Sequence, residues 1–507
     1  MSFPRSSGIL LHPTSLPGGF GIGDLGAAAY EFADFLSSGG QSIWQMLPLG
    51  PTGYGDSPYQ CFSAFAGNPA LISLARLVDL GWLHAKDVDD VPEFSAEQVE
   101  YERVNQFKQR KLSQAFQEFA RAAPESEKLK LAEFKNAERG WLADFALFRA
   151  LKGKFGGVAW PKWERQFALR DPDALAKARA ELAYEIAEQE FLQFVFFEQW
   201  ESLKCYCGER TIRVMGDLPI YVAHDSADVW VHPEYFHLDA EGNATKVAGV
   251  PPDYFSASGQ LWGNPIYRWD QMAVDGYSWW VERFRAAFRM FDMLRVDHFR
   301  GFEAYWEVPG GETTAQNGKW VKGPGAELFA AVEAKLGKLP IVAENLGVIT
   351  AGVEAIRERF GFPGMAILQF AFGNDPQGPS FRPHNYPRNL LAYTGTHDND
   401  TVMGWWTSKP GKGSIRSEED IRKEREFTRV YLNLDRESVN WAFIRTLMGS
   451  VADTVIFPLQ DALGLGSEAR VNTPGTATGN WRWRLRGELV TAELAERLKE
   501  MVLVYDR

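Results

Sequence analysis

The chain has 507 residues, of which 45% are hydrophobic and 24% are charged, and this composition is typical of a globular protein and excludes disorder and collagen-like repeats. Its 54 Lys and Arg residues against 66 Asp and Glu residues give a net charge of −12, which argues against nucleic acid or an anionic membrane as a partner, because both require basic clusters. No apolar run is long enough to cross a bilayer, and the N-terminus lacks the features of a signal peptide. We therefore expect a soluble, cytoplasmic protein.

Short apolar runs that end in polar or glycine-rich residues recur along the chain, and helical patterns separate them. Each run is short enough for a fully buried strand. Eight such strands alternating with helices predict an α/β fold, the (β/α)8 TIM barrel, whose active site lies where the strands end. The predicted strands are Gly8–Leu11, Ser42–Leu47, Ile212–Gly216, Met293–Val296, Pro340–Ala343, Met365–Ala371, Leu390–Thr394 and Thr454–Phe457. The predicted helices between them include Ala27–Ser37, Tyr277–Met290, Ala326–Leu336 and Gly352–Phe360.

Two long segments interrupt the alternation of strands and helices. Residues 66–210 are rich in charge, and Tyr101–Ala123 and Ala174–Leu203 carry apolar residues at helical spacing. We interpret this segment as a helical subdomain inserted after the second strand. Residues 220–269 are rich in Pro, Gly, Tyr, His and Trp, and we interpret them as substrate-binding loops with little regular structure. The whole chain, 1–507, is then a single catalytic barrel with these two interruptions.

Carboxylates follow four of the predicted strands, and these are Asp217, Asp297, Glu344 and Asp398. Arg295 lies two residues before Asp297, so both side chains point into the barrel, where the guanidinium favours an ionised nucleophile. Glu344 follows an apolar run, and burial raises the pKa of a carboxyl, as a general acid at neutral pH requires. Two such groups on neighbouring strands suit retaining glycoside chemistry, which needs them about 5–5.5 Å apart. The alternative for each acid is a structural ion pair at a strand end.

Other chemistries fit the same residues less well. His397 and Asp398 are neighbours on a strand end, so we expect them to point to opposite faces and not to form a dyad. A catalytic triad would need an activated serine, and the sequence has no G-x-S-x-G pattern. Several acids with imidazoles suit a hard cation, but no metal-ligand spacing is present, and the pair Cys205 and Cys207 has no second pair nearby. We therefore expect no metal and reduced thiols.

Several motifs spread over nearly the whole chain resemble those of one known family. They are Arg5-Ser6-Ser7-Gly8-Ile9, His12-Pro13-Thr14-Ser15-Leu16, Pro48-Leu49-Gly50-Pro51-Thr52, Gly55-Asp56-Ser57-Pro58-Tyr59, Gly216-Asp217-Leu218-Pro219-Ile220-Tyr221, Pro251-Pro252-Asp253-Tyr254-Phe255, Arg295-Val296-Asp297-His298-Phe299-Arg300-Gly301-Phe302, Ala343-Glu344-Asn345-Leu346-Gly347 and Thr394-Gly395-Thr396-His397-Asp398-Asn399-Asp400-Thr401. The chain resembles the amylomaltases, the 4-α-glucanotransferases or disproportionating enzymes of the α-amylase clan. Together these motifs are far more specific than any single carboxylate.

The resemblance implies a role for each matched residue. Asp297 would be the nucleophile, Glu344 the acid/base, and Asp398 the stabiliser of the transition state. Arg295 would orient the nucleophile, and His397 and Asp217 would bind hydroxyls of the donor sugar. Ser57, Tyr59 and Trp262 would line the glucan groove. Tyr254 and Phe255 would lie in a loop that closes over the acceptor side. The family also favours an acidic residue after the sixth strand, and either Asn374 or Asp375 could take that place. The resemblance also implies that the enzyme works without a cofactor or a required metal.

The implied reaction is the transfer of a segment of a 1,4-α-D-glucan to the 4-hydroxyl of glucose or another glucan, through a covalent glycosyl-aspartate with retention. Formation of large cyclic glucans is a further expectation. Two alternatives stay open: an α-glucan hydrolase with the same carboxylates, and a non-catalytic glucan-binding protein, against which the intact trio of acids argues. The sequence does not indicate an oligomeric state.

Overall fold

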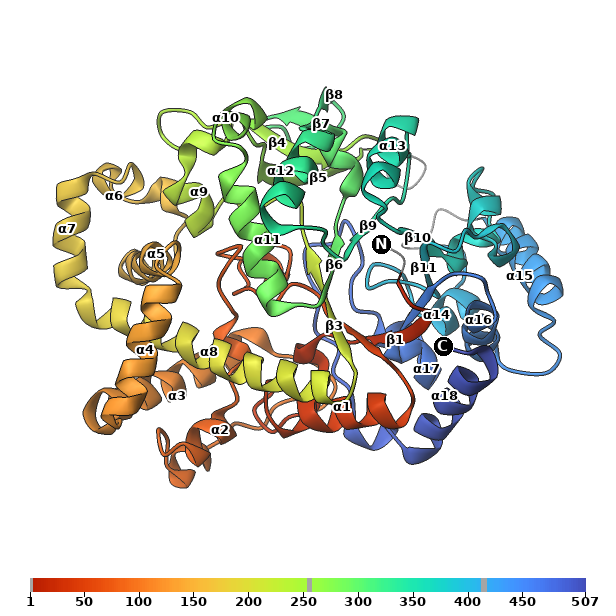
Figure 1. The fold of residues 1–507 in the computed structure, drawn as a ribbon, viewed down its shortest axis with the longest axis horizontal. Coiled ribbons are helices and arrows are strands. Elements are labelled where there is room, and N and C mark those ends of the chain that lie inside the picture. Colours follow the sequence, from red (N-terminus) through yellow and green to blue (C-terminus); the bar gives the residue numbers. More distant parts are fainter. Residues whose placement is uncertain (1–2, 253–257, 412–416) are drawn as a thin grey trace.

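The predicted barrel is present in the computed structural model, which describes residues 3–252, 258–411 and 417–507 (Figure 1). Eight parallel strands form one sheet in the order β10-β11-β12-β1-β2-β3-β6-β9. All eight predicted strands are confirmed, although the sixth is shorter than expected and continues as a 3-10 helix at Leu368–Ala371. The strands are β1 (Ser6–Leu10), β2 (Ile43–Gln45), β3 (Arg213–Leu218), β6 (Met293–Val296), β9 (Ile341–Ala343), β10 (Gly364–Ile367), β11 (Leu390–Tyr393) and β12 (Thr454–Pro458).

The sheet closes into a barrel between β9 and β10 through contacts of each strand with a residue just outside the other strand. The backbone N–H of Ala343 donates to the carbonyl of Pro363 at 2.9 Å. The N–H of Met365 donates to Oδ1 of Asn345 at 2.8 Å. An asparagine side chain therefore replaces part of the ladder at the seam, directly after the predicted acid Glu344.

The interior of the barrel is filled by one set of alternating side chains. One buried apolar cluster contains a residue from each of the eight strands: Leu10, Ile43, Met215, Met293, Val342, Met365, Leu391 and Ile456. Their strand neighbours, such as Leu294 and Val214, belong to the cluster that packs against the helices. Side chains two apart on a strand share a face, so the interior position of Met293 also places Arg295 inside the barrel, as the sequence predicts.

Helices surround the sheet, and the four predicted between strands begin and end within one residue of their expected bounds. These are α1 (Ala27–Ser38), α11 (Ser278–Met290), α12 (Ala326–Leu336) and α13 (Ala351–Phe360). Further helices around the barrel are α10 (Trp269–Val274), α14 (Val402–Thr407), α15 (Glu418–Leu432), α16 (Val439–Met448), α17 (Leu459–Leu463) and α18 (Ala492–Tyr505). Among the described residues, no helix combines the length and the apolar character needed to cross a membrane.

A group of helices lies between β2 and β3, to the left of the barrel in Figure 1. They are α2 (Leu74–Asp79), α3 (Tyr101–Ala122), α4 (Glu125–Ala137), α5 (Leu142–Lys154), α6 (Arg165–Ala168), α7 (Pro172–Glu181) and α8 (Ala183–Glu209). The single helical stretch expected over Ala174–Leu203 is two helices, because Leu182 leaves helical geometry at φ −107° and ψ 25°. α8 also contacts α1, α11 and β3 of the barrel. The division of the chain into a barrel and a subdomain at 66–210 stays a prediction.

The segment 220–269 has more regular structure than the sequence analysis expected. It contains α9 (Ala227–Val231), β4 (Lys246–Val250) and β5 (Gln260–Pro265). These strands join β7 (Ala304–Pro309) and β8 (Lys319–Lys322) in an antiparallel sheet of order β5-β4-β7-β8, which we call the small sheet. The expectation was wrong because β4 pairs both with the nearby β5 and with β7, which lies beyond the Asp297 motif, and the non-local part of this pairing gives short strands no local signal.

Candidate active site

Three of the four acids that the sequence analysis singled out lie at the carboxyl ends of the barrel strands. Asp217 is the fifth residue of β3, Asp297 follows β6, and Glu344 follows β9. The parallel ladder continues into two of them, since the N–H of Asp297 donates to the carbonyl of Leu218 at 3.0 Å and the N–H of Glu344 to that of Val296 at 3.1 Å. Their backbones are therefore held by the sheet and not by flexible loops.

Arg295 joins two of these acids. Its Nη1 donates to Oδ2 of Asp217 at 2.6 Å, and its Nη2 pairs with Oδ1 of Asp297 at 2.8 Å. The arginine side chain is only 5% exposed. Burial lowers the pKa of Arg295, but the two carboxylates outweigh burial and hold it well above its ordinary value. The guanidinium therefore stays charged and pairs with Asp297 from inside the barrel, the position that strand alternation predicts.

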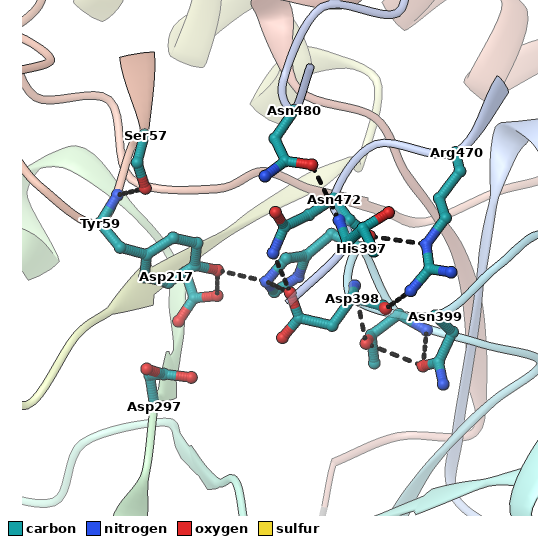
Figure 2. Close-up of polar contacts among 12 residues, drawn as sticks. Ser57, Tyr59, Asp217, Asp297, His397, Asp398, Asn399, Arg470, Asn472 and Asn480 are labelled. Atoms are coloured by element: carbon teal, nitrogen blue, oxygen red, sulfur yellow. Dashed lines mark hydrogen bonds and ion pairs between the residues drawn. The ribbon is translucent and has the colours of Figure 1, made fainter. Parts of the chain in front are cut away.

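A chain of hydrogen bonds connects Asp217 to the loop after β11 (Figure 2). The hydroxyl of Tyr59 donates to Oδ2 of Asp217 at 2.8 Å, and its oxygen lies 2.9 Å from Nε2 of His397. Because the single hydroxyl proton of Tyr59 goes to Asp217, Nε2 of His397 must carry the proton and donate to the tyrosine oxygen. The rings of Tyr59 and His397 are also stacked, with centroids 5.2 Å apart.

Asp398 is held by residues that follow β12, the strand next to β11 in the barrel. Nδ2 of Asn472 donates to its Oδ1 at 2.6 Å, and Nη2 of Arg470 donates to its backbone carbonyl at 2.8 Å. Its Oδ1 also lies 3.3 Å from Nε2 of His397. The expectation that His397 and Asp398 point to opposite faces was therefore wrong. β11 ends at Tyr393 and both residues lie in a turn, where strand alternation no longer applies.

The carboxyl of Glu344 accepts two backbone hydrogen bonds. Oε1 accepts from the N–H of Leu346 at 2.9 Å, and Oε2 accepts from the N–H of His298 at 2.8 Å. His298 has φ +48°, a left-handed conformation that is unfavourable for a non-glycine residue and recurs at functional sites. Burial raises the pKa of Glu344 to about 8, with Arg295 lowering it and Asp297 raising it further. Glu344 is therefore largely protonated at neutral pH, as a general acid requires.

The remaining predicted site residues are placed less directly. Ser57 accepts a hydrogen bond from the N–H of Tyr59 at 3.2 Å. Trp262 lies on β5 with its ring edge-on to His298, centroids 4.8 Å apart, so the small sheet reaches the residue that follows Asp297. Tyr254 and Phe255 lie outside the described residues.

The acidic position that the family favours after the sixth strand is not assigned to either candidate residue. Nδ2 of Asn374 donates to Asp420 at 2.7 Å, and Oδ1 of Asp375 accepts from the N–H of Gln377 at 2.8 Å. Both residues therefore make local contacts, and neither is singled out for substrate.

Sequence analysis missed Arg470, Asn472 and Trp481. Asn472 is 74 residues from Asp398, and Trp481 packs on the rings of Tyr59 and His397. The only signal was a polar segment, Asn472-Thr473-Pro474-Gly475, after the last strand, where barrel enzymes carry functional loops. Within the described residues, no cluster of His, Cys, Asp and Glu is arranged to hold a metal ion.

The chain is similar to known proteins over almost its whole length. The family described as 4-alpha-glucanotransferase matches residues 11–491. A 4-alpha-glucanotransferase of Synechocystis sp. is 50% identical over 506 residues, covering 99% of this chain and 98% of the relative. One from Thermus thermophilus is 48% identical, with both chains covered completely. The solved structure of an amylomaltase from Streptococcus agalactiae in complex with acarbose superposes with a TM-score of 0.94 at 40% identity, covering 99% of each chain. The chain belongs to the 4-alpha-glucanotransferase family.

Proposed function

We propose that Asp297 and Glu344 carry out the glucan transfer of this 4-α-glucanotransferase by a retaining double displacement. The enzyme class follows from the family and from 50% identity to a relative over nearly the whole chain, and the division of labour among the residues is the proposal. One observation carries it. The carboxylate of Asp297 is paired with the buried guanidinium of Arg295. Glu344, on the neighbouring strand end, has a carboxyl whose pKa is raised by burial to about 8. Opposed environments of this kind separate a nucleophile from a general acid.

The first displacement breaks the glycosidic bond of the donor. Asp297 attacks C1 of the donor sugar, while Glu344 gives its proton to the glycosidic oxygen of the leaving segment. The products are a covalent glycosyl-Asp297 and a free glucan end with a new 4-hydroxyl. The pairing with Arg295 at 2.8 Å orients the attacking carboxylate before the substrate binds.

The second displacement forms the new bond. Glu344, now ionised, takes the proton of an acceptor 4-hydroxyl, and the acceptor oxygen attacks C1 and releases Asp297. Its two backbone donors, the N–H groups of Leu346 and His298, stabilise the ionised form that this step needs. Two inversions at C1 give net retention. Water can replace the acceptor, and that outcome is the hydrolase alternative.

Sugar hydroxyls are assigned to the polar groups around these two acids. Oδ1 of Asp217 is buried and has no hydrogen-bond partner in the described structure, so a donor hydroxyl would satisfy it. The contacts of Asp398 with Asn472 and His397 both use Oδ1, and we assign its Oδ2 to hydroxyls whose hydrogen bonds strengthen in the transition state. Trp262, beside His298, is assigned to the glucan groove.

The substrates we propose are an α-1,4-glucan donor and a glucose or glucan acceptor, with large cyclic glucans as a further product. The amylomaltase with TM-score 0.94 was solved with acarbose bound, which supports a sugar ligand here. Loop closure by Tyr254 and Phe255, the absence of a cofactor and a cytoplasmic location stay predictions.

Incubation with maltotriose tests the proposal, with products followed by mass spectrometry. Longer glucans together with glucose establish transfer. Glucose and maltose alone, without longer chains, would favour the hydrolase, and unchanged maltotriose would favour a binding protein. An Asp297→Asn variant run in parallel excludes a contaminating activity.

A further inference from the structure

We propose that Arg300, held on the ring of Trp320, is a positioning residue that fixes the loop after Asp297 and the loop after Glu344 relative to each other. The inference rests on the proposed acid/base role of Glu344. It concerns the small sheet, which lies above β6 in Figure 1. It gives this sheet a part in proton transfer, in addition to supporting Trp262.

Arg300 connects three elements. It lies in the 3-10 helix Phe299–Phe302, directly after the nucleophile, and is 7% exposed. Its Nη1 donates to the backbone carbonyl of Val348, in the loop that follows Glu344. Its guanidinium carbon lies 3.8 Å from the centroid of the Trp320 ring, on β8. A planar guanidinium can stack on an aromatic face and still direct its N–H groups to an acceptor in its own plane.

Trp320 is itself held by the small sheet. Its ring is edge-on to that of Trp306, with centroids 5.3 Å apart, and the two residues are paired across β7 and β8. The indole N–H of Trp306 donates to the carbonyl of Ala315 at 2.8 Å. The arginine therefore rests on a paired and hydrogen-bonded platform, so that the position of its guanidinium is determined by the sheet.

The loops joined by Arg300 are the same two that supply the hydrogen bonds of Glu344. His298, two residues before Arg300, donates to Oε2, and Leu346, two residues before Val348, donates to Oε1. If the link between the loops is lost, we expect both N–H groups to move relative to the carboxyl. The proton would then be delivered from a less favourable position, and the ionised form of Glu344 would lose hydrogen bonds that stabilise it.

The charged groups around Glu344 determine the direction of the effect. Burial raises its pKa, Arg295 lowers it, Asp297 raises it, and the two backbone N–H groups lower it. The charged group that faces Arg300 is Glu303. A weakened link acts on the two backbone hydrogen bonds, and since these lower the pKa of Glu344, their loss raises it.

The test is Trp320→Leu, because Trp320 is 41% exposed and its replacement leaves the barrel core intact. Rates on maltotriose are measured against pH together with a melting curve. We expect kcat to fall about tenfold with KM nearly unchanged, since misplacement near 1 Å can cost up to 100-fold. We also expect the alkaline limb of the profile to move up by about half a pH unit as hydrogen bonds to the carboxylate are lost.

Matched variants separate positioning from general damage. Trp320→Phe keeps a ring under the guanidinium. It should retain most of the wild-type kcat and have its alkaline limb at the same pH as the wild type. Arg300→Met should reproduce Trp320→Leu. Tyr184→Leu removes another half-exposed ring, 49% exposed and packed on Phe116 of α3, and should leave the profile unchanged. An alkaline limb that stays in place or moves to lower pH in Trp320→Leu overturns the proposal, even if the melting temperature falls.

Failure of the underlying acid/base assignment gives a different result. Glu344→Gln should lose activity on maltotriose yet still form the intermediate from α-glucosyl fluoride, which needs no protonation to leave. If Glu344→Gln keeps wild-type activity on maltotriose, Glu344 is not the acid and the proposed function fails. If Glu344→Gln behaves as expected while the limb of Trp320→Leu does not move, only the role of Arg300 fails.

Discussion

At the scale of single residues, the site is organised around one buried arginine. Arg295 pairs with both Asp217 and Asp297, so a single positive charge balances two negative ones at the barrel opening. Removing one partner of such a buried set leaves an uncompensated charge, which costs more than the set contributes when complete. The arrangement therefore fixes the orientation of Asp297.

Asp297→Asn tests the nucleophile directly. The amide keeps the shape of the carboxylate and can still accept from Arg295, so the fold should persist. Turnover should fall by about 10⁴- to 10⁶-fold, the range for single members of a catalytic unit. Trapping the intermediate of the wild-type enzyme and sequencing the labelled peptide gives an independent check. A sugar adduct on a residue other than Asp297 would contradict the assignment.

Tyr59→Phe tests the hydrogen-bond chain that links Asp217 to His397. The ring and its stacking on His397 remain, while both hydrogen bonds of the hydroxyl are lost. Asp217 then loses a donor and His397 an acceptor, so we expect kcat/KM on maltotriose to fall by about 10- to 100-fold, or about 1.4–2.7 kcal/mol of transition-state stabilisation. Equal kcat/KM in the variant and the wild type would limit Tyr59 to a stacking role.

At the scale of elements, strand alternation explains which site residues the sequence could place. It correctly assigned Arg295 and Asp297 to the barrel interior, because both lie at or next to the end of a regular strand. It failed for His397 and Asp398, because β11 ends at Tyr393 and a turn rotates both side chains toward the opening. Periodicity predicts side-chain direction only while the backbone is regular.

Asn472→Leu tests the support that this turn receives from the loop after β12. Leucine has nearly the same volume but cannot donate to Oδ1 of Asp398, which Asn472 reaches at 2.6 Å. We expect kcat to fall by about 10- to 100-fold, because a misplaced carboxylate stabilises the transition state poorly. Thr476→Val serves as a control on the same loop, since Thr476 bonds Thr473 and Asn480 but no acid. If both variants keep wild-type kcat, Asp398 is positioned by other contacts.

At the scale of the whole molecule, residues far apart in sequence complete the site, because the barrel strands alone do not supply all of its contacts. Asn472 reaches Asp398 across 74 positions, and the small sheet combines strands from both sides of the nucleophile motif. The repeated strand and helix pattern made the barrel predictable from local sequence. These long-range contacts were not predictable, because no local propensity encodes a partner that only the folded barrel brings near.

The last prediction concerns the stability of the whole molecule against pH. The pKa of Glu344 is raised by burial from 4.5 to about 8, so the folded state binds a proton that the unfolded state has released between these values. Stability from this group is complete below about pH 4.5 and is lost as pH rises through about 8. Glutamine cannot ionise, so the Glu344→Gln variant does not lose this stability as the pH rises.

Thermal melting of Glu344→Gln and the wild type at pH 5 and pH 9 measures the effect. After a discount for the partial exposure of the side chain, we expect the variant to gain about 2 kcal/mol relative to the wild type between the two pH values, or about 2 °C in Tm for a chain of this length. All other titrating groups are common to both proteins and cancel in the difference. A difference in Tm that is the same at pH 5 and pH 9 would mean that Glu344 ionises in the folded enzyme as it does in water, and it could then not serve as the general acid at neutral pH.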